Sequence, residues 1–215
     1  MKDKASQEII LTDEYIDAHE DNLINFLTSL KNEGKDLNQP LQLGEYTGYT
    51  PLHIACLKGN LKATEFLLAE KVDATVALQT GPYKGFRAAA LAARSGNVEI
   101  IQLLWPEDVE VNQKITFGDY AEYTPFHIAC IHGHAEAADL IQECDTELDS
   151  TIALQVGPYK GFHPAAFAAQ NPNSGLISRL LDDGFNPDQL IPSGKYKGYT
   201  MLHIACLFEV LKTIQ

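Results

Sequence analysis

Histidines, cysteines and paired acids are the residues of this chain whose chemistry could support catalysis or metal binding. The sequence contains 7 histidines and 4 cysteines, and His132-Gly133-His134 brings two imidazoles close together, as a metal site requires. Asp182 and Asp183 form a pair of carboxylates, but nothing beside them would give one the role of acid and the other that of base. The sequence has no nucleophile elbow, phosphate-binding loop or spaced set of metal ligands. We therefore predict no enzymatic activity, no cofactor and no metal site.

The elements that would position such residues form an internal repeat. Each repeat begins with a glycine-aromatic turn, and successive turns are 37, 37, 39 and 37 residues apart. The turns start at Gly44, Gly81, Gly118, Gly157 and Gly194. A period of this length is typical of a solenoid, in which each unit packs on its neighbours. Within a unit, the pattern predicts a short helix, a glycine turn, an amphipathic second helix and a hairpin-like finger.

Two stretches carry a family resemblance. GYTPLHIACLKGNLKATEFLL (48–68) and EYTPFHIACIHGHAEAADLI (122–141) resemble the ankyrin repeat, whose pattern is G-x-T-P-L-H-x-A, a glycine turn and a leucine-rich helix. The resemblance covers about residues 12–215 and implies an all-α solenoid with β-hairpin fingers, that is, an ankyrin-repeat stack. We expect a capping helix pair at 1–40 and repeats over 41–215, the last one incomplete. An incomplete last unit would expose core, which favours a fragment of a longer protein over an irregular cap.

The units depart from the usual ankyrin pattern in length and in alternation. Each is about 37 residues long, where 33 is usual, and the extra residues fall in the finger, which they would lengthen by roughly 7 Å. The second and fourth units share the turn GPYKGF, at Gly81–Phe86 and Gly157–Phe162, and lack the capping threonine and internal histidine. Their alanine-rich helices, with Ala88–Ala90 and Ala165–Ala166, suggest either two similar ligand pockets or a recent duplication, and we favour the duplication.

The resemblance implies structural roles for the repeated histidines and cysteines. His53, His127 and His203 share the histidine position of the pattern, which in the family ties neighbouring units together by hydrogen bonds. His134 falls in the turn, so that only His132 would face the concave side. Cys56, Cys130 and Cys206 lie two units apart, about 20 Å from one another, which is too far for a disulfide. With Cys144 also unpaired, the cysteines fit a reducing compartment.

In the ankyrin family, binding lies mainly on the concave side, at the finger tips, before the helix cap and at the end of the first helix. The tip tyrosines are Tyr46, Tyr83, Tyr120, Tyr159 and Tyr196. The aromatic residues before the cap are Tyr49, Phe86, Tyr123, Phe162 and Tyr199. The helix-end candidates are Leu57, Lys58, Arg94, Ile131 and His132. Rings at every finger either stack to stiffen the fingers or form an interface, and we favour the structural role at the tips.

The charges on the fingers vary from unit to unit, which is more typical of a binding surface. The basic tip residues are Lys84, Lys160, Lys195 and Lys197. We predict that these lysines attract an acidic segment of a partner protein. An excess of acids between Glu107 and Asp149 is either a solvated face or a patch for a basic partner, and we favour the solvated face.

The whole chain is acidic, with a formal net charge of −13 at pH 7 over 215 residues. Such a surface repels nucleic acid and anionic lipid, so we predict neither as a partner. The N-terminus does not resemble a secretory signal, and a cytoplasmic location is therefore expected. We predict a monomeric scaffold that binds another protein through its concave, finger-side surface.

Two further alternatives concern context. The closely matched double units are similar to those of bacterial effectors delivered into host cells, which would place the protein in host cytosol. Alternatively, the chain is the adaptor part of a larger enzyme whose catalytic part lies beyond residue 215.

Overall fold

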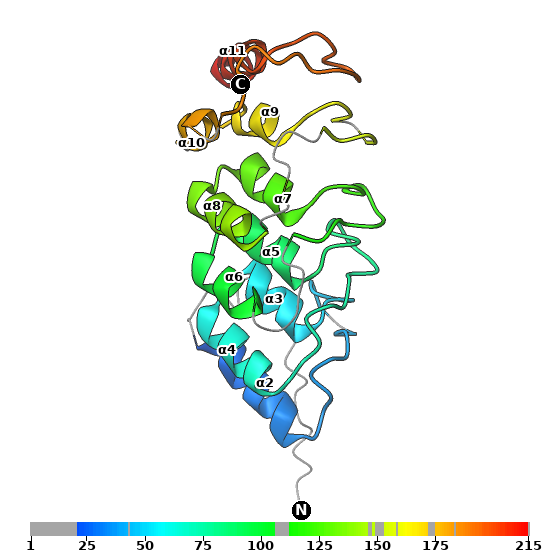
Figure 1. The fold of residues 1–215 in the computed structure, drawn as a ribbon. Coiled ribbons are helices and arrows are strands. Elements are labelled where there is room, and N and C mark those ends of the chain that lie inside the picture. Colours follow the sequence, from blue (N-terminus) through cyan, green and yellow to red (C-terminus); the bar gives the residue numbers. More distant parts are fainter. Residues whose placement is uncertain are drawn as a thin grey trace, which may run out of the picture.

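The computed structural model describes residues 21–42, 44–105, 112–145, 148, 153–157, 159–171, 175–182 and 184–214, with the backbone alone over 209–214. Its helices form two columns, and loops project from one of them to the same side (Figure 1). We call the column nearer the loops the inner helices. They are α3 (Pro51–Leu57), α5 (Ala88–Ser95), α7 (Pro125–His132), α9 (Pro164–Ala168) and α11 (Met201–Ile214). The outer helices are α2 (Asn22–Asn32), α4 (Leu61–Ala69), α6 (Val98–Leu104), α8 (Ala135–Cys144) and α10 (Leu176–Asp182).

The order of contacts is that of a solenoid. Each inner helix packs on the next, from α3 through α5, α7 and α9 to α11, and the outer helices α2, α4, α6 and α8 pack in the same order. Helices α2 and α11 therefore lie at opposite ends of the stack (Figure 1). The core is one continuous layer between the columns and includes Leu67, Leu91, Ile101, Ile128 and Leu180. No helix within the described residues has the length and apolar character needed to cross a membrane.

The first helix of each odd-numbered unit begins with the same cap. The Oγ1 of Thr50 accepts a hydrogen bond from the backbone N–H of His53, whose Nδ1 accepts one from the N–H of Thr50 at 3.1 Å. The Nε2 of His53 lies 3.0 Å from the carbonyl oxygen of Val76, in the segment that leads into the second finger. The Thr124/His127 and Thr200/His203 pairs repeat the cap. All three histidines therefore cap their own helix, and the longer-range hydrogen bond expected from the resemblance is seen at His53, which reaches the segment leading into the second finger.

The turns after the first helices join the units as well. The side-chain amide of Asn97 donates to the carbonyl of Gly59 in the preceding unit at 3.2 Å. The Nε2 of His134 lies 3.0 Å from the carbonyl oxygen of Arg94, and this contact makes the equivalent link between the third and second units. His134 therefore supports the stack, as its predicted turn position implied.

Each finger is a loop closed by two backbone hydrogen bonds. In the second unit, the N–H of Leu78 donates to the carbonyl of Phe86 and the N–H of Gly85 donates to the carbonyl of Leu78, at 2.9 and 2.7 Å. The same pair of bonds occurs in all five units, at Leu41, Leu78, Ile115, Leu154 and Ile191. Among the described residues the fingers contain no regular strand, so the predicted β-hairpin is a short, two-bond closure.

Glycines allow adjacent fingers to touch through their backbones. Gly85 has φ +92°, and a Cβ there would lie 2.2 Å from the carbonyl oxygen of Phe117 in the third finger. Gly161 has the same relation to Ser193 in the fifth finger. At the corresponding position of the third unit stands Glu122, a non-glycine residue with φ 71°. The third and fourth fingers therefore meet without this contact.

The ends of the chain match the predictions in part. The second helix of the predicted N-terminal pair is present as α2, and the first lies outside the described residues. Helix α11 continues as one 14-residue helix through the segment where a turn and a second helix would otherwise follow. Leu202 of α11 is 72% exposed, whereas Leu52 and Phe126 at the same repeat position are buried.

Candidate functional site

The residues with catalytic or metal-binding chemistry are dispersed along the stack. Within the described part of the chain, no group of three histidine, cysteine or acidic side chains could hold a metal ion. His132 and His134 stack with ring centroids 6.1 Å apart, but the Nε2 of His134 is engaged with the carbonyl of Arg94. Burial, followed by the charge of Arg94 and by His134, lowers the pKa of His132 to about 4, so its imidazole is neutral at pH 7.

The four cysteines are free thiols, and three of them lie in positions that disfavour reactivity, whereas Cys206 is exposed. Cys56 and Cys130 are completely buried between inner helices, and burial raises the pKa of Cys56 to about 12. Burial, together with Glu143 and Asp145, also raises the pKa of Cys144 to about 12. A thiol must ionise to act as a nucleophile, so these three residues are unsuited to that role.

The predicted contact residues separate into buried and exposed groups. Five of the ten finger aromatics are at most 6% exposed, and they are Tyr46, Tyr49, Phe86, Tyr123 and Phe162. Their rings lie in the core beneath the neighbouring units, so we correct their assignment from partner contact to packing. Tyr83, Tyr120, Tyr159 and Tyr196 are half-buried, and Tyr199 is 40% exposed in the last unit.

The finger rings pack on one another across the units. Phe86 contacts Tyr120 of the next finger with centroids 5.0 Å apart, and Phe162 contacts Tyr196 at 5.2 Å. Between the third and fourth fingers, Phe167 of α9 bridges the gap, 5.8 Å from Tyr123 and 5.3 Å from Tyr159. The stacking of finger rings that we favoured from the sequence is confirmed. Edge-to-face and tilted contacts of this kind restrict the orientation of each finger relative to the next.

Sequence reasoning missed Phe167 and His163. Phe167 stands at the repeat position occupied by Ile54, Leu91 and Ile128. The replacement of an aliphatic side chain by a larger aromatic ring was the feature of the sequence that could have identified it. His163 stands where odd units have the capping threonine, and its Nδ1 accepts from the N–H of Ala166 at 3.2 Å. It is completely buried, with its ring 4.7 Å from that of Phe185, and burial lowers its pKa to about 4.

The tip lysines are exposed, as a binding surface requires. Lys84 lies 6.0 Å above the ring of Phe117, and Lys195 lies 5.1 Å from the ring of Tyr196. Among the described residues, neither these two lysines nor Lys160 and Lys197 forms an ion pair. These four lysines, which we call the tip lysines, therefore present charge to solvent.

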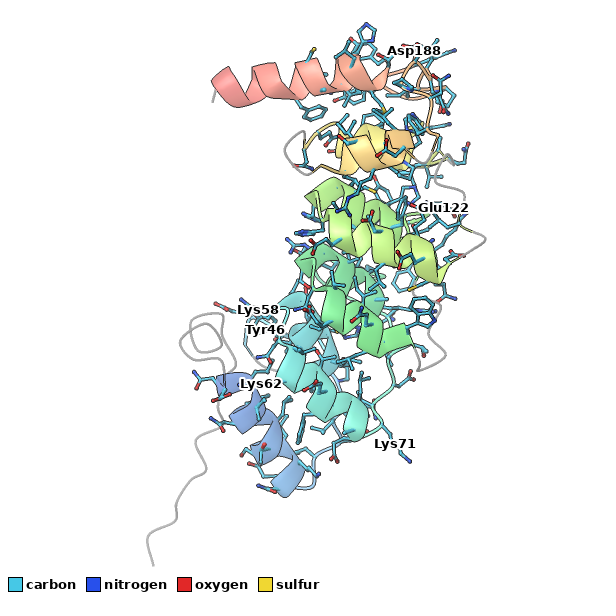
Figure 2. The ribbon with its side chains drawn as sticks, turned by 60° about the vertical axis from the view of Figure 1, so that its left-hand side comes forward. Tyr46, Lys58, Lys62, Lys71, Glu122 and Asp188 are labelled. Carbon is cyan, nitrogen blue, oxygen red and sulfur yellow. The ribbon has the colours of Figure 1, made fainter. Side chains whose placement is uncertain are left out.

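The helix-end candidates differ in character. Leu57 and Ile131 are half-buried and pack against the core, so they contribute mainly to the scaffold. Lys58 is half-buried near Tyr46 at the end of α3 (Figure 2). The guanidinium of Arg94 lies 4.7 Å above the ring of Tyr83, where it makes a cation–π contact on the finger side. His132, at the end of α7, is open to solvent on one side, while its ring stacks on His134 and is thereby partly desolvated, which accounts for its lowered pKa.

The alanine-rich helices do not line ligand pockets. Ala88, Ala89 and Ala90 are at most 4% exposed, and Ala165 and Ala166 are completely buried. The cavity beside Ala89 and Ala90 measures only about 10 Å³, far below the roughly 300 Å³ of a small-molecule site. Small side chains here allow the inner helices to approach, which favours the duplication over two paired pockets.

Larger spaces occur where the third and fourth units meet. A cavity of about 230 Å³ is lined by residues that include Lys114, Glu122, His127 and Leu154. A second, of about 500 Å³, opens between the fingers at Asp119 and Val156. The glycine-to-carbonyl contact seen at Gly85 and Gly161 is replaced here by Glu122, whose carboxylate pairs with Lys114 at 3.3 Å.

Comparison with protein families agrees with this architecture. The family model described as ankyrin repeats (3 copies) matches residues 16–115 and 75–152. The chain belongs to the ankyrin-repeat family. Proteins of this family generally act as protein–protein interaction modules, and the fold is typically a non-catalytic binding scaffold.

A solved structure has the same ankyrin fold. The crystal structure of the human ASB11 ankyrin repeat domain matches with a TM-score of 0.60 and 22% sequence identity, over 77% of this chain. The chain spans 66% of the length of that domain. At this level of identity the likeness concerns the fold alone. The comparison with curated proteins gave no significant match.

Proposed function

We propose that this ankyrin-repeat chain binds a partner protein through its finger side, and that the partner contributes an acidic segment. The observation that carries the proposal is the position of the tip lysines. They are exposed at the ends of the fingers in a chain whose formal net charge is −13. Oppositely charged segments approach such a surface faster and in a preferred orientation.

The distribution of the acids supports this assignment. The outer helices carry Glu65, Glu99, Glu136, Glu143 and Asp182, on the side of the stack away from the fingers. The fingers carry fewer acids, and Glu122 among them is already paired with Lys114. An acidic partner is therefore repelled by the outer side and attracted to the tips.

The fixed arrangement of the fingers also supports the proposal. The buried rings hold successive tips at fixed spacing, so that a partner meets charges whose geometry is set before binding. A surface organised in advance loses less conformational entropy when the complex forms.

The test first identifies the partner by affinity capture with cross-linking from cell lysate, and then measures its dissociation constant. The double variant Lys195→Glu/Lys197→Glu is compared with Lys35→Glu/Lys71→Glu, which makes the same charge change at exposed positions just after the outer helices α2 and α4, outside the finger tips. We expect at least tenfold weaker binding for the tip variant alone and a smaller dependence of its affinity on salt. Equal affinities of the two variants would refute the proposed surface.

The predicted contexts, a bacterial effector or the adaptor part of a larger enzyme, remain predictions. They differ in the source of the partner. Parallel captures from bacterial and host lysates would separate them, because an effector has its specific partner in the host lysate.

A further inference from the structure

We propose that Arg94 is an anchor for a single anionic group, a carboxylate or a phosphate, on the segment that a partner places along the finger side. The neighbours of Arg94 include Tyr83, whose ring centroid lies 4.7 Å from the guanidinium, and Tyr120, whose pKa, raised mainly by burial, is influenced by the charge of Arg94. The inference deepens the proposed function and rests on it, since it names one subsite within that surface. Arginine suits this role because its planar guanidinium can donate two parallel hydrogen bonds to either group.

The repeat position of Arg94 is the first argument. The equivalent residues are Leu57 in the first unit, Ile131 in the third, Gln170 in the fourth and Leu207 in the fifth, so that Arg94 is the one charged side chain among the five. Leu57 and Ile131 pack against the core, so the scaffold is served by an apolar side chain at this place. An arginine here is not needed for stacking, and its guanidinium is turned onto the finger side, over Tyr83.

The electrostatic surroundings are the second argument. No described residue forms an ion pair with Arg94, although acids outnumber bases in the chain. The positive charge of Arg94 influences the pKa of three neighbouring residues. Burial and Tyr83 raise the pKa of Tyr49 and of Tyr120, and Arg94 partly opposes this rise. Burial lowers the pKa of His132, and Arg94 lowers it further. Arg94 thus lies among phenols and an imidazole from three units.

Partial burial makes this unneutralised charge significant. Arg94 is half-buried, so its guanidinium has lost part of its hydration without gaining a carboxylate partner. A bound anion would supply the missing partner in an environment where the attraction is screened less than at an exposed tip. Burial is the main cause of the raised pKa of Tyr120, and Asp119 of the third finger has the smallest influence on it, after Tyr83, Arg94 and Tyr159. Within the described part of the chain, Asp119 forms no ion pair with Arg94. The site therefore retains one positive charge for a ligand.

The test uses two fluorescently labelled probes, an acetylated hexaglutamate peptide and an acetylated peptide of alternating serine and phosphoserine, with binding followed by anisotropy. The variant Arg94→Leu introduces the residue found at this position in the first unit, and Arg94→Lys retains the charge without the planar fork. The control Arg87→Leu removes the other arginine of the same unit, at the opposite end of α5. Urea unfolding of each variant is measured in parallel.

We expect Arg94→Leu to weaken binding of at least one probe about tenfold, Arg94→Lys to weaken it less, and Arg87→Leu to leave it within twofold. The probe that suffers the larger loss identifies the group as carboxylate or phosphate. Wild-type affinity of Arg94→Leu for both probes would overturn the anchor. The tip variant Lys195→Glu/Lys197→Glu in the same titration still tests the proposed function, so the two ideas can fail separately.

Discussion

The rings and the lysines of one finger lie only one or two residues apart in sequence, yet they occupy different environments. Phe162 is completely buried between Tyr159, Phe167 and Tyr196, whereas Lys160 of the same turn is exposed. Residues that recur in all units form the ring layer, and residues that vary from unit to unit form the outer edge. In this chain, a residue type that recurs in every unit indicates a role in the scaffold, whereas a residue type that varies between units indicates a candidate contact residue.

A substitution in the ring layer should have the largest effect on stability and so should separate the two regions most clearly. Phe162→Ala removes a ring that contacts three others and should lower the free energy of unfolding by about 3–5 kcal/mol in urea denaturation. Tyr199→Ala, at the same repeat position but 40% exposed, should cost about 1 kcal/mol. Similar losses for the two variants would contradict a buried ring layer.

A methyl group at a finger-to-finger contact should have the next largest effect. Gly85→Ala adds a Cβ 2.2 Å from the carbonyl oxygen of Phe117 at φ +92°, so we expect a loss of roughly 3 kcal/mol. Gly34→Ala also has positive φ but no atom within 4 Å, and should cost about 1 kcal/mol. Differential scanning calorimetry of the pair separates the clash from backbone strain. Equal shifts in Tm would show that the fingers do not touch here.

Acid should weaken the stack through its buried histidines. Burial lowers the pKa of His53 and of His163 to about 4. The unfolded chain, with a histidine pKa near 6.5, therefore binds more protons, so stability is complete above about pH 6.5 and falls as pH decreases toward 4. Each histidine should contribute about 2 kcal/mol of loss by pH 4.5.

His163→Asn tests this pH dependence with the cap retained. An asparagine can accept the hydrogen bond from Ala166 and does not titrate. Denaturation between pH 7.5 and 4.5 should give a smaller loss of stability for the variant than for the wild type. Identical slopes would mean that His163 is protonated or exposed in the folded state.

The outer edge should show the smallest effect on stability. Lys195→Glu/Lys197→Glu changes two exposed side chains without ion pairs to described residues, so the free energy of unfolding should change by less than about 0.5 kcal/mol. Urea denaturation provides the value. A loss above about 1.5 kcal/mol would place these lysines with the scaffold and remove the distinction between the two regions.

The sequence was sufficient for the stack and for its helix starts. The period of about 37 residues, Thr50-Pro51 and the glycine after the first helix of the first three units predict elements that the structure contains. These features are local, because caps and turns depend on a few neighbouring residues. The structural histidines and free cysteines followed from their recurrence at one repeat position.

The burial of the rings and the opening between the third and fourth units were not predictable in this way. Whether Tyr123 contacts a partner or the core depends on Phe167, which lies 44 residues further along the chain. The sequence shows Glu122 where the other units have a glycine. Whether this residue opens a space between two fingers depends on how closely the next finger approaches. Such outcomes depend on distances between units, which the composition of one unit does not fix.

The face that contacts a partner is the central claim, and amide hydrogen exchange of the chain with and without its captured partner measures it most directly. We expect slower exchange in the partner's presence at the finger tips, around residues 83–85, 159–161 and 194–198. We expect no change in the outer helices α4, α6 and α8. Protection confined to those outer helices, with the tips unaffected, would contradict the account.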